Sequence, residues 1–247
     1  MASVVFSVSS WQQPVPEPIS AERSALLERL AGRVVGLGSG RLRVGIDGGS
    51  AAGKTSLGHE LASWIARAGR PVLRACLDDF KRPWRDRLVV DRESAEGYYR
   101  NAFDWSGARR LLLDPFGSGG AGAVALCSID PLTQVDHSAE LTAVPEGAVL
   151  VVDGVFAFRP QLVSCWDLRV WVGVDPDVAV SRSVVRDESW AGSQARELML
   201  TRYLPGERLY RQEVDPVGLA HVALDNSDVA RPHVIKWSPG PEASGRD

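Results

Sequence analysis

The chain of 247 residues is 45% hydrophobic and 24% charged, with a formal net charge of −3. This composition is typical of a folded globular protein of one to two domains, and it excludes global disorder. Proteins that bind nucleic acid backbone usually carry a basic excess and membrane-spanning proteins carry a long apolar run, so the sequence predicts neither nucleic acid nor a membrane as a partner.

The first residues predict no regular element. Prolines at positions 14, 16 and 18 and the absence of a basic start predict a flexible leader over 1–19 rather than a secretory signal. Apolar residues at helical spacing then predict a helix over Ser20–Val35, capped by the Ser20 side chain. The further expected elements are strand Arg41–Asp47, helix Lys54–Arg67, strand Pro71–Leu77, an irregular charged segment over 81–91, helix Asp104–Leu113, strands Gly147–Asp153 and Leu168–Val174, helices Pro176–Val185 and Ser193–Tyr203, and strand His221–Leu224.

Strands alternate with helices along most of the chain, which favours an α/β fold with a mostly parallel sheet and helices on both faces. The segment Gly147–Asp153 is almost entirely apolar, as expected of a strand that is buried on both faces. We expect a single domain over 20–229 and a flexible tail over 230–247. Three widely spaced cysteines indicate reduced thiols and a cytoplasmic protein.

A glycine-rich segment connects the first expected strand to the next helix. It matches the phosphate-binding pattern G-x-x-x-x-G-K-[ST], in which glycines let several backbone N–H groups point at one phosphate chain. Lys54, one of three lysines, stands where the pattern's lysine reaches the β- and γ-phosphates, and the Thr55 hydroxyl stands where Mg²⁺ is held. The predicted nucleotide-binding residues of this loop are Gly48, Gly49, Ser50, Ala51, Ala52, Gly53, Lys54, Thr55 and Ser56.

Carboxylates follow three of the expected strands. Ligands bind at the carboxyl ends of parallel strands, so Asp78 and Asp79 are candidates to accept a proton from an attacking hydroxyl, with a helix cap or surface turn as the alternative. Asp153 ends the most apolar strand, which is the pattern of an acid that orders Mg²⁺, with a buried structural carboxylate as the alternative. For Asp47, inside the glycine-rich segment, turn chemistry is the preferred interpretation.

Several arginines lie in or beside the two helices expected after the fourth strand. Arg182 and Arg186 are four residues apart and share a helical face, and Arg196 and Arg202 follow. A cationic lid over about 182–204 would stabilise the charge of a transferring phosphoryl group and exclude water. The alternative is a solvated helix face paired with neighbouring acids.

Aromatic residues and one histidine stand out between these motifs. Tyr98, Tyr99, Phe103 and Trp105 form a dense group, which is typical of a core and could also wall a pocket for a flat base. His137 lies in an expected loop, where a lone histidine is usually structural or exposed.

The ordered set of motifs resembles the uridine kinase family of P-loop nucleoside kinases, over about residues 40–226. The segments that carry the resemblance are GIDGGSAAGKTS, LDDF, NAFDW, VLVVDGVFAF, SRSVVRD and RYLPGERLY. The resemblance implies a P-loop NTPase three-layer sandwich with a helical lid, and ATP and Mg²⁺ as cofactors. It also implies transfer of the γ-phosphoryl group to a hydroxyl of a small molecule, foremost the 5′-hydroxyl of a uridine- or cytidine-like nucleoside.

Carried onto this sequence, the resemblance implies roles for individual residues. Lys54, Asp78 and Arg186 would be catalytic, and Arg182 and Arg186 would contact the nucleotide. Thr55, Asp78 and Asp153 would serve the metal, Asp153 standing where uridine kinases usually have Glu. Asn226 would lie near the adenine. The expected substrate-binding residues are Asp79, Asn101, Phe103, His137 and Arg196.

Three positions depart from the family pattern. Asn101 stands where an aspartate often binds the ribose hydroxyls, Leu132 where a tyrosine precedes the histidine, and Lys81 where an aromatic residue is usual. These departures favour keeping two alternatives: a kinase for another hydroxyl compound, such as pantothenate, a vitamin riboside or a modified nucleoside, and a nucleotide-binding regulator without transfer activity. The sequence leaves a homo-oligomer open.

Overall fold

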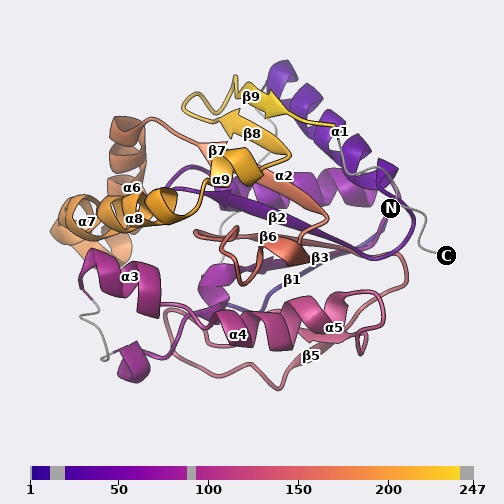
Figure 1. Ribbon diagram of the computed structural model, residues 1–247, viewed down its shortest axis with the longest axis horizontal. Helices are drawn as coiled ribbons and strands as arrows, with labels where there is room; N and C mark the ends of the chain where they lie inside the picture. The colour runs from indigo at the N-terminus through magenta and orange to yellow at the C-terminus, as the bar shows by residue number, and fades with distance from the viewer. Residues whose placement is uncertain (1, 12–19, 88–92, 240–247) are drawn as a thin grey trace.

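The computed structural model describes residues 2–11, 20–87 and 93–239 of the chain. Its centre is a seven-stranded sheet in the order β1-β3-β6-β2-β7-β8-β9 (Figure 1). All neighbouring strands are parallel except β8 and β9, which are antiparallel, so the predicted mostly parallel sheet is confirmed. The strands are β1 (Val4–Phe6), β2 (Leu42–Gly48), β3 (Val72–Cys76), β6 (Val149–Asp153), β7 (Leu168–Gly173), β8 (Val222–Asp225) and β9 (His233–Trp237).

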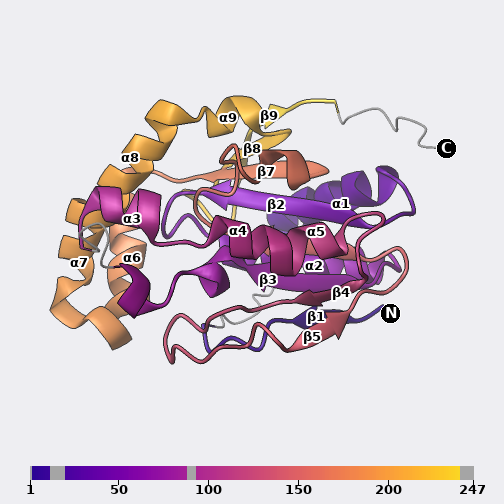
Figure 2. The same ribbon diagram turned by 60° about the horizontal axis from the view of Figure 1, so that its bottom comes forward.

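Helices cover both faces of this sheet, as expected of a three-layer α/β sandwich (Figures 1 and 2). One face carries α1 (Ala21–Gly36) and α2 (Lys54–Arg67). The other carries α4 (Trp105–Ala108), a π-helical turn over Arg109–Leu113, and α5 (Asp114–Phe116). In the described part of the chain, no helix is both long and apolar enough to cross a membrane.

The side chains of β6 divide between two hydrophobic clusters. Val149 and Val151 pack with α1 and α2, whereas Leu150 and Val152 pack with the helices of the opposite face. All four are fully buried. Successive strand residues point to opposite sides, so a strand with helices on both faces needs apolar residues at nearly every position.

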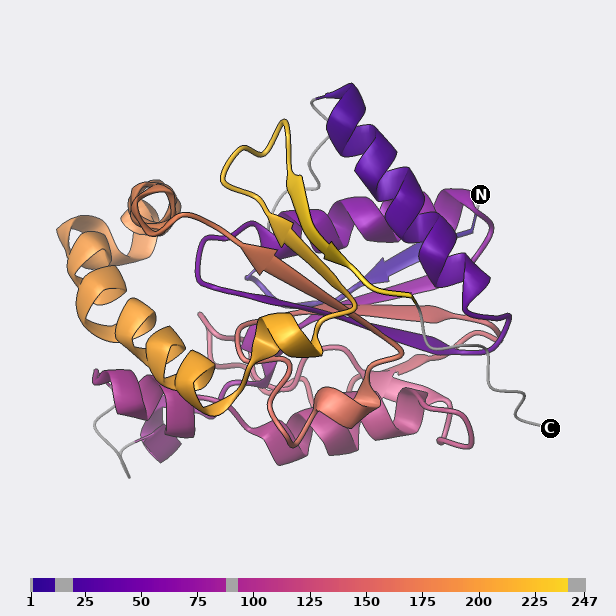
Figure 3. The same ribbon diagram turned by 45° about the horizontal axis from the view of Figure 1, so that its top comes forward.

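Beyond the sheet, a group of helices lies at one end of the molecule (Figure 3). This group contains α3 (Ala95–Asn101), α6 (Pro176–Ala191), α7 (Ala195–Leu198), a π-helical turn over Met199–Tyr203, and α8 (Leu204–Glu213). The chain returns to the sheet through α9 (Pro216–Leu219), and a small hairpin of β4 (Ala123–Ala125) and β5 (Leu141–Ala143) flanks α5. Neither α3 nor this hairpin was among the predicted elements.

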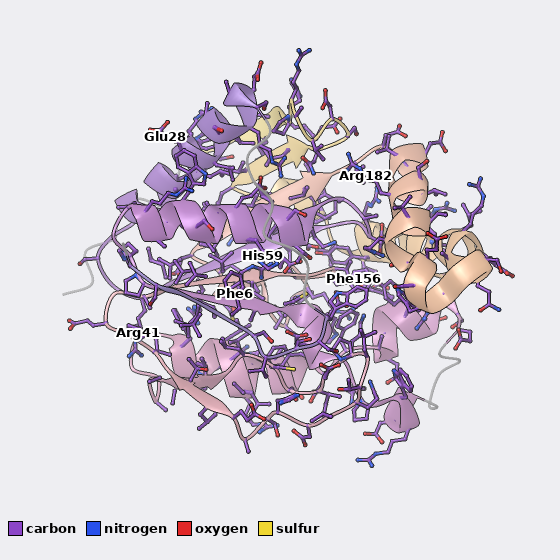
Figure 4. All side chains as sticks on the ribbon, turned by 180° about the vertical axis from the view of Figure 1, so that it is seen from behind. Phe6, Glu28, Arg41, His59, Phe156 and Arg182 are labelled. Atoms are coloured by element: carbon purple, nitrogen blue, oxygen red, sulfur yellow. The ribbon has the colours of Figure 1, made fainter. Side chains whose placement is uncertain are left out.

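The segments expected as a flexible leader and a flexible tail each contribute an edge strand to the sheet. Val4–Phe6 pairs in parallel with β3, and the Phe6 ring lies edge-on to His59 with centroids 5.3 Å apart (Figure 4). His233–Trp237 pairs with β8, and Trp237 lies 3.7 Å beneath the Arg29 guanidinium. A short edge strand is stabilised by such tertiary contacts rather than by its own pattern. The leader's proline-rich part, 12–19, and residues 240–247 lie outside the described residues.

The helices after β7 are longer than predicted. The helix expected over Pro176–Val185 continues to Ala191 and ends at Gly192, whose φ of 53° few other residues adopt. The helix expected over Ser193–Tyr203, with a resumption after Pro205 and Gly206 as an alternative, runs without interruption from Ala195 to Glu213. Proline lacks the N–H that a helix interior uses for hydrogen bonding. Pro205 is tolerated because it lies in the first turn of α8, directly after a wider π turn. Of the irregular segment expected over 81–91, residues 84–87 form a short 3₁₀ turn and 88–91 lie outside the described residues.

Candidate active site

A cleft of about 820 Å³ opens at the carboxyl ends of β2, β3 and β6, between the sheet and the helices that follow β7. The topology brings the loops after these strands to one edge, where open parallel sheets bind ligands. The cleft brings together many of the predicted site residues: Ser50, Ala51, Gly53, Lys54, Thr55, Ser56, Asp78, Asp153, Arg182, Arg186, Arg202 and Asn226. Of the other predicted loop residues, Gly48, Gly49 and Ala52 complete the loop without lining the cleft.

The phosphate loop adopts the curled conformation that its glycines allow. Gly53 has a φ of 90°, and a Cβ at this position would lie 2.5 Å from Asn226 Nδ2. Lys54 Nζ donates to the Gly49 carbonyl oxygen at 2.7 Å, so its ammonium lies across the loop's opening. Helix α2 begins at Lys54, directing its N-terminal N–H groups and the positive end of its dipole at the cleft.

Two side chains from distant elements brace this loop. Glu207 on α8 accepts a hydrogen bond from the Ser50 N–H through Oε1 at 2.6 Å. Asn226, after β8, donates from Nδ2 to the Ala52 carbonyl oxygen at 2.8 Å, and its Oδ1 accepts from Arg23. The loop's shape is therefore set by tertiary contacts as well as by its glycines.

Asp47 also fixes the loop, in the structural role preferred from the sequence. Its Oδ1 accepts from the Gly48 N–H, and its Oδ2 accepts from the Phe158 N–H and the Tyr210 hydroxyl. Burial raises the pKa of Asp47 to about 6, while these hydrogen bonds act in the opposite direction.

Asp153 lies between two partners at the end of β6. Its Oδ2 accepts from the Thr55 hydroxyl at 2.6 Å, and its Oδ1 accepts from Arg74 at 2.5 Å. Arg74 is fully buried in β3, and its guanidinium occupies the space beneath Gly58, where a Cβ would lie 2.6 Å from Nη2. This arginine was missed in the sequence, although a charge inside the apolar strand segment PVLRACL signals a buried partner.

The Thr55–Asp153 pair fits a Mg²⁺ site in which the bound nucleotide supplies some of the ligands. Both side chains offer oxygen, the ligand that Mg²⁺ prefers, and both line the cleft. Among the described residues, no group of three or more His, Cys, Asp or Glu could hold a metal by itself. Such a site would be completed by phosphate oxygens and water, as is usual for Mg²⁺.

Asp78 lies in the cleft and forms an ion pair with Lys81. Burial acts to raise the pKa of Asp78, but the Lys81 charge and hydrogen bond, with Lys54 and Arg186 nearby, outweigh it, so that the pKa lies below its ordinary value. The carboxylate is thus ionised at neutral pH and faces the same space as Lys54.

The neighbouring Asp79 points away from the cleft. It is fully buried, and its Oδ2 accepts from the Ser7 hydroxyl at 2.8 Å. Burial raises its pKa to about 7. The structure therefore brings Asp78, and not Asp79, to the nucleotide loop; Asp79 instead attaches the N-terminal segment to β3.

The structure does not bring the other predicted substrate residues into the cleft wall. Phe103 is buried and stacks on Trp105 with centroids 4.6 Å apart. His137 pairs with Glu140 at 2.8 Å, Asn101 ends α3, and Arg196 is exposed. Local sequence gives the chemical type of these four side chains but not the direction in which they point. We therefore assign none of the four to substrate binding.

Of the four predicted lid arginines, Arg182 and Arg186 line the cleft from α6, and Arg202 lines it from the π turn before α8. Arg182 donates to the carbonyl oxygens of Asn226 and Ser227 at 3.0 and 2.8 Å, which ties α6 to the loop after β8 (Figure 4). Arg186 pairs with Asp187 at 2.6 Å and lies near enough to Asp78 for their charges to interact. The shared helical face predicted for the two arginines thus points at the nucleotide loop.

Other cleft residues lie outside the predicted site. Trp11 reaches the cleft from the N-terminal segment, Trp84 from the turn after β3, and Gln194 from the turn between α6 and α7. No local pattern distinguishes them, because their place depends on how remote segments pack. Arg23 on α1 also lines the cleft and is held there by hydrogen bonds to Glu60 and Asn226.

Comparisons with known proteins agree with this geometry. The model of the Phosphoribulokinase / Uridine kinase family matches residues 43–216. The chain is 30% identical over 193 residues to a uridine kinase of Deinococcus deserti, covering 77% of this chain and 86% of that protein, and 26% identical to a uridine kinase of Halobacterium salinarum, covering 70% and 74%.

Solved structures show the same fold at low identity. A possible uridine kinase from Bacillus stearothermophilus superposes with a TM-score of 0.61 at 21% identity, covering 81% of this chain and 97% of that one. Phosphoribulokinase from Rhodobacter spheroides superposes with a TM-score of 0.53 at 12% identity, covering 85% and 83%. The chain is therefore an ATP-binding P-loop kinase that belongs to the phosphoribulokinase and uridine kinase family.

Proposed function

We propose that the protein transfers the γ-phosphoryl group of ATP to a hydroxyl of a small molecule, foremost the 5′-hydroxyl of a nucleoside. The observation that carries this proposal is one cleft in which Lys54, the Thr55–Asp153 pair and the ionised Asp78 face each other. Phosphoryl transfer needs this set: a cradle for the phosphates, oxygen ligands for Mg²⁺ and a carboxylate for the attacking hydroxyl.

The phosphate loop and Lys54 would hold the β- and γ-phosphates at the start of α2. Thr55 and Asp153 would hold Mg²⁺, which when bound neutralises phosphate charge. Arg74 keeps one Asp153 oxygen engaged and thereby fixes the direction of the other.

Asp78 would orient the acceptor hydroxyl and take its proton. In the transfer, the hydroxyl oxygen bonds to the γ-phosphorus, the bond from that phosphorus to the β–γ bridging oxygen breaks, and the hydroxyl proton passes to the Asp78 carboxylate. A pKa below the ordinary value keeps the Asp78 carboxylate ionised and thus able to accept a proton. In a loose transition state, the hydroxyl loses this proton only after most of the bond to the leaving oxygen has broken.

The lid arginines would act on charge and water. Arg186 lies on the Asp78 side of the cleft, where negative charge grows on the equatorial oxygens during transfer. Closure of α6 over the nucleotide would also keep water from taking the phosphoryl group.

Two classes of acceptor have support. Curated relatives named uridine kinases support a nucleoside. Lys81 and Leu132 both line the cleft, and both depart from the pattern of those kinases. These two residues favour the second candidate, a kinase for a different hydroxyl compound such as pantothenate, a vitamin riboside or a modified nucleoside.

Release of ADP in the presence of ATP, Mg²⁺ and a panel of nucleosides and small alcohols tests the proposal. We expect turnover with at least one acceptor and a loss of about 100-fold or more in kcat for Asp78→Asn, because general-base assistance contributes about 10²–10⁴-fold. Asp114→Asn, a matched change at an exposed pair with Arg109 outside the cleft, should leave turnover unchanged. Full turnover in Asp78→Asn would show that another group takes the proton.

A further inference from the structure

Arg202 is a cation in the cleft wall that is held by aromatic rings. It lies in the π turn before α8, and its guanidinium carbon lies 5.4 Å from the ring centroid of Tyr98 and 5.5 Å from that of Tyr203. Its Nε is buried without a hydrogen-bond partner in the described structure. Cation–π contact fixes a guanidinium without neutralising it, so Arg202 keeps its capacity to bind an anion.

The other cleft cations already have acceptors. Arg23 pairs with Glu60, Arg186 with Asp187 and Lys81 with Asp78, while Arg182 and Lys54 bind backbone carbonyl oxygens. Within residues 2–11, 20–87 and 93–239, Arg202 is the cleft cation with neither a carboxylate nor a carbonyl acceptor. The Arg202 guanidinium is therefore available to donate hydrogen bonds to a ligand.

Arg202 lies on the acceptor side of the cleft. Tyr98, which its guanidinium contacts, lines the cleft together with Ser50 and Asp78 and lies close enough to the Asp78 carboxylate for that charge to raise the pKa of the Tyr98 hydroxyl. A group bound by Arg202 would thus lie beside both the phosphate loop and the expected base. Arg182, Asn226 and Val229 lie together on another side of the cleft, where the family resemblance implies the adenine.

The side chains that line the cleft include more cations than carboxylates. Six cationic side chains line it: Arg23, Lys54, Lys81, Arg182, Arg186 and Arg202. Three carboxylates oppose them, of which Asp78 and Asp153 are paired with Lys81 and Arg74, and the third is Glu93. Glu60 and Asp187, outside the lining, neutralise Arg23 and Arg186. Among the described residues, the cleft cations without a carboxylate partner are therefore Lys54, Arg182 and Arg202, and Lys54 and Arg182 bind backbone carbonyl oxygens.

We propose that the phosphate acceptor of this kinase carries an anionic group, a carboxylate or a phosphate, which the Arg202 guanidinium binds while the acceptor's hydroxyl faces Asp78. The inference rests on the proposed function and narrows its acceptor class. A planar guanidinium can donate two parallel hydrogen bonds to either anion, which fixes the orientation of the molecule as well as its affinity.

Matched acceptor pairs, in which a hydroxyl of the neutral member replaces the anionic group of the charged member, test the inference. Suitable pairs are pantothenate and pantothenol, glycerate and glycerol, ribose 5-phosphate and ribose, and uridine 3′-phosphate and uridine, so that carboxylates and phosphates are tried separately. With ATP and Mg²⁺ we expect the charged member of at least one pair to have the higher kcat/KM. The class of the preferred pair identifies the anion.

Substitutions of Arg202 test whether this residue causes the preference for the charged acceptor. Arg202→Gln should raise the KM of the charged acceptor about 10- to 100-fold, the usual range for loss of a charged hydrogen bond, and leave the KM of ATP within about twofold. Arg202→Lys should recover part of the preference. Arg208→Gln, the same charge change at an exposed position of α8 outside the cleft, should change neither constant.

Each other outcome contradicts a defined part of the account. Efficient turnover of neutral acceptors, with no effect of Arg202→Gln on acceptor KM, would overturn the anionic class and leave the kinase proposal standing. A rise in the KM of ATP alone would assign Arg202 to the nucleotide and overturn the inference. Binding of MgATP without transfer to any member of any pair would contradict the proposed function itself.

Discussion

At the residue scale, the Arg74–Asp153 pair shows how a buried charge is tolerated beside the phosphate loop. Both side chains are almost fully buried, and each hydrogen-bonds further, Asp153 with Thr55 and Arg74 with backbone carbonyls. A buried ion pair adds little stability compared with an apolar pair, but removing one partner leaves an uncompensated charge. The pair therefore serves to orient Asp153 more than to stabilise the fold.

This account predicts strong coupling between the two residues. Arg74→Met and Asp153→Asn should each lower the free energy of unfolding by about 3 kcal/mol, and the double variant should lose at least about 1 kcal/mol less than the sum. Urea unfolding of nucleotide-free protein in EDTA measures this cycle. The exposed pair of Arg100 and Glu96 is the control, where Arg100→Met and Glu96→Gln should couple by no more than about 0.5 kcal/mol. Additive losses at Arg74 and Asp153 would contradict the positioning role.

Residue identity alone indicated the nucleotide half of the site and not the acceptor half. The phosphate loop, Asp78 and Asp153 could be predicted, because the motif fixes their spacing and strand ends meet at one edge of a parallel sheet. Phe103 and His137 were misplaced, since their orientation depends on packing against Trp105 and Glu140. Trp11 reaches the cleft through an edge strand that only tertiary pairing stabilises.

At the element scale, α6 and the π turn before α8 pack together in a cluster of their own. Ala179, Val180 and Met199 form a small hydrophobic cluster separate from the two large ones, and Gly192 separates the helices. Val185 and Trp190 expose 76% and 45% of their surface although they are large and apolar, so this segment is less well packed than the sheet. Periodicity predicted these helices, but the length of each depended on Gly192 and on the π turn before Pro205.

We therefore expect α6 and the π turn to close on the substrates. Addition of Mg²⁺ with a non-hydrolysable ATP analogue and an accepted hydroxyl compound should slow amide hydrogen exchange over 177–204, while α1 and β6 stay unchanged. Hydrogen exchange followed by mass spectrometry measures this difference. Equal exchange with and without the ligands would show that these helices are a fixed wall.

At the scale of the whole molecule, the parallel sheet explains why residues far apart in sequence act together. The turn after β2, Asp78 after β3 and Asp153 at the end of β6 meet because all three strands run in the same direction. Glu207 and Asn226 then connect the loop to α8 and to the segment after β8. The regular core could be predicted from alternating strands and helices, whereas the edge strands β1 and β9 depend on pairing with β3 and β8, which local sequence does not indicate.

The central claim is that the cleft delivers the γ-phosphoryl group to a hydroxyl held at Asp78. A single-turnover reaction with γ-labelled ATP, Mg²⁺ and the acceptor panel, separated by chromatography, follows the label directly. The account predicts label on an acceptor with wild-type protein and a rate lower by about 100-fold or more with Asp78→Asn. Label that stays in ATP, or that is released only as inorganic phosphate with every acceptor, would contradict it.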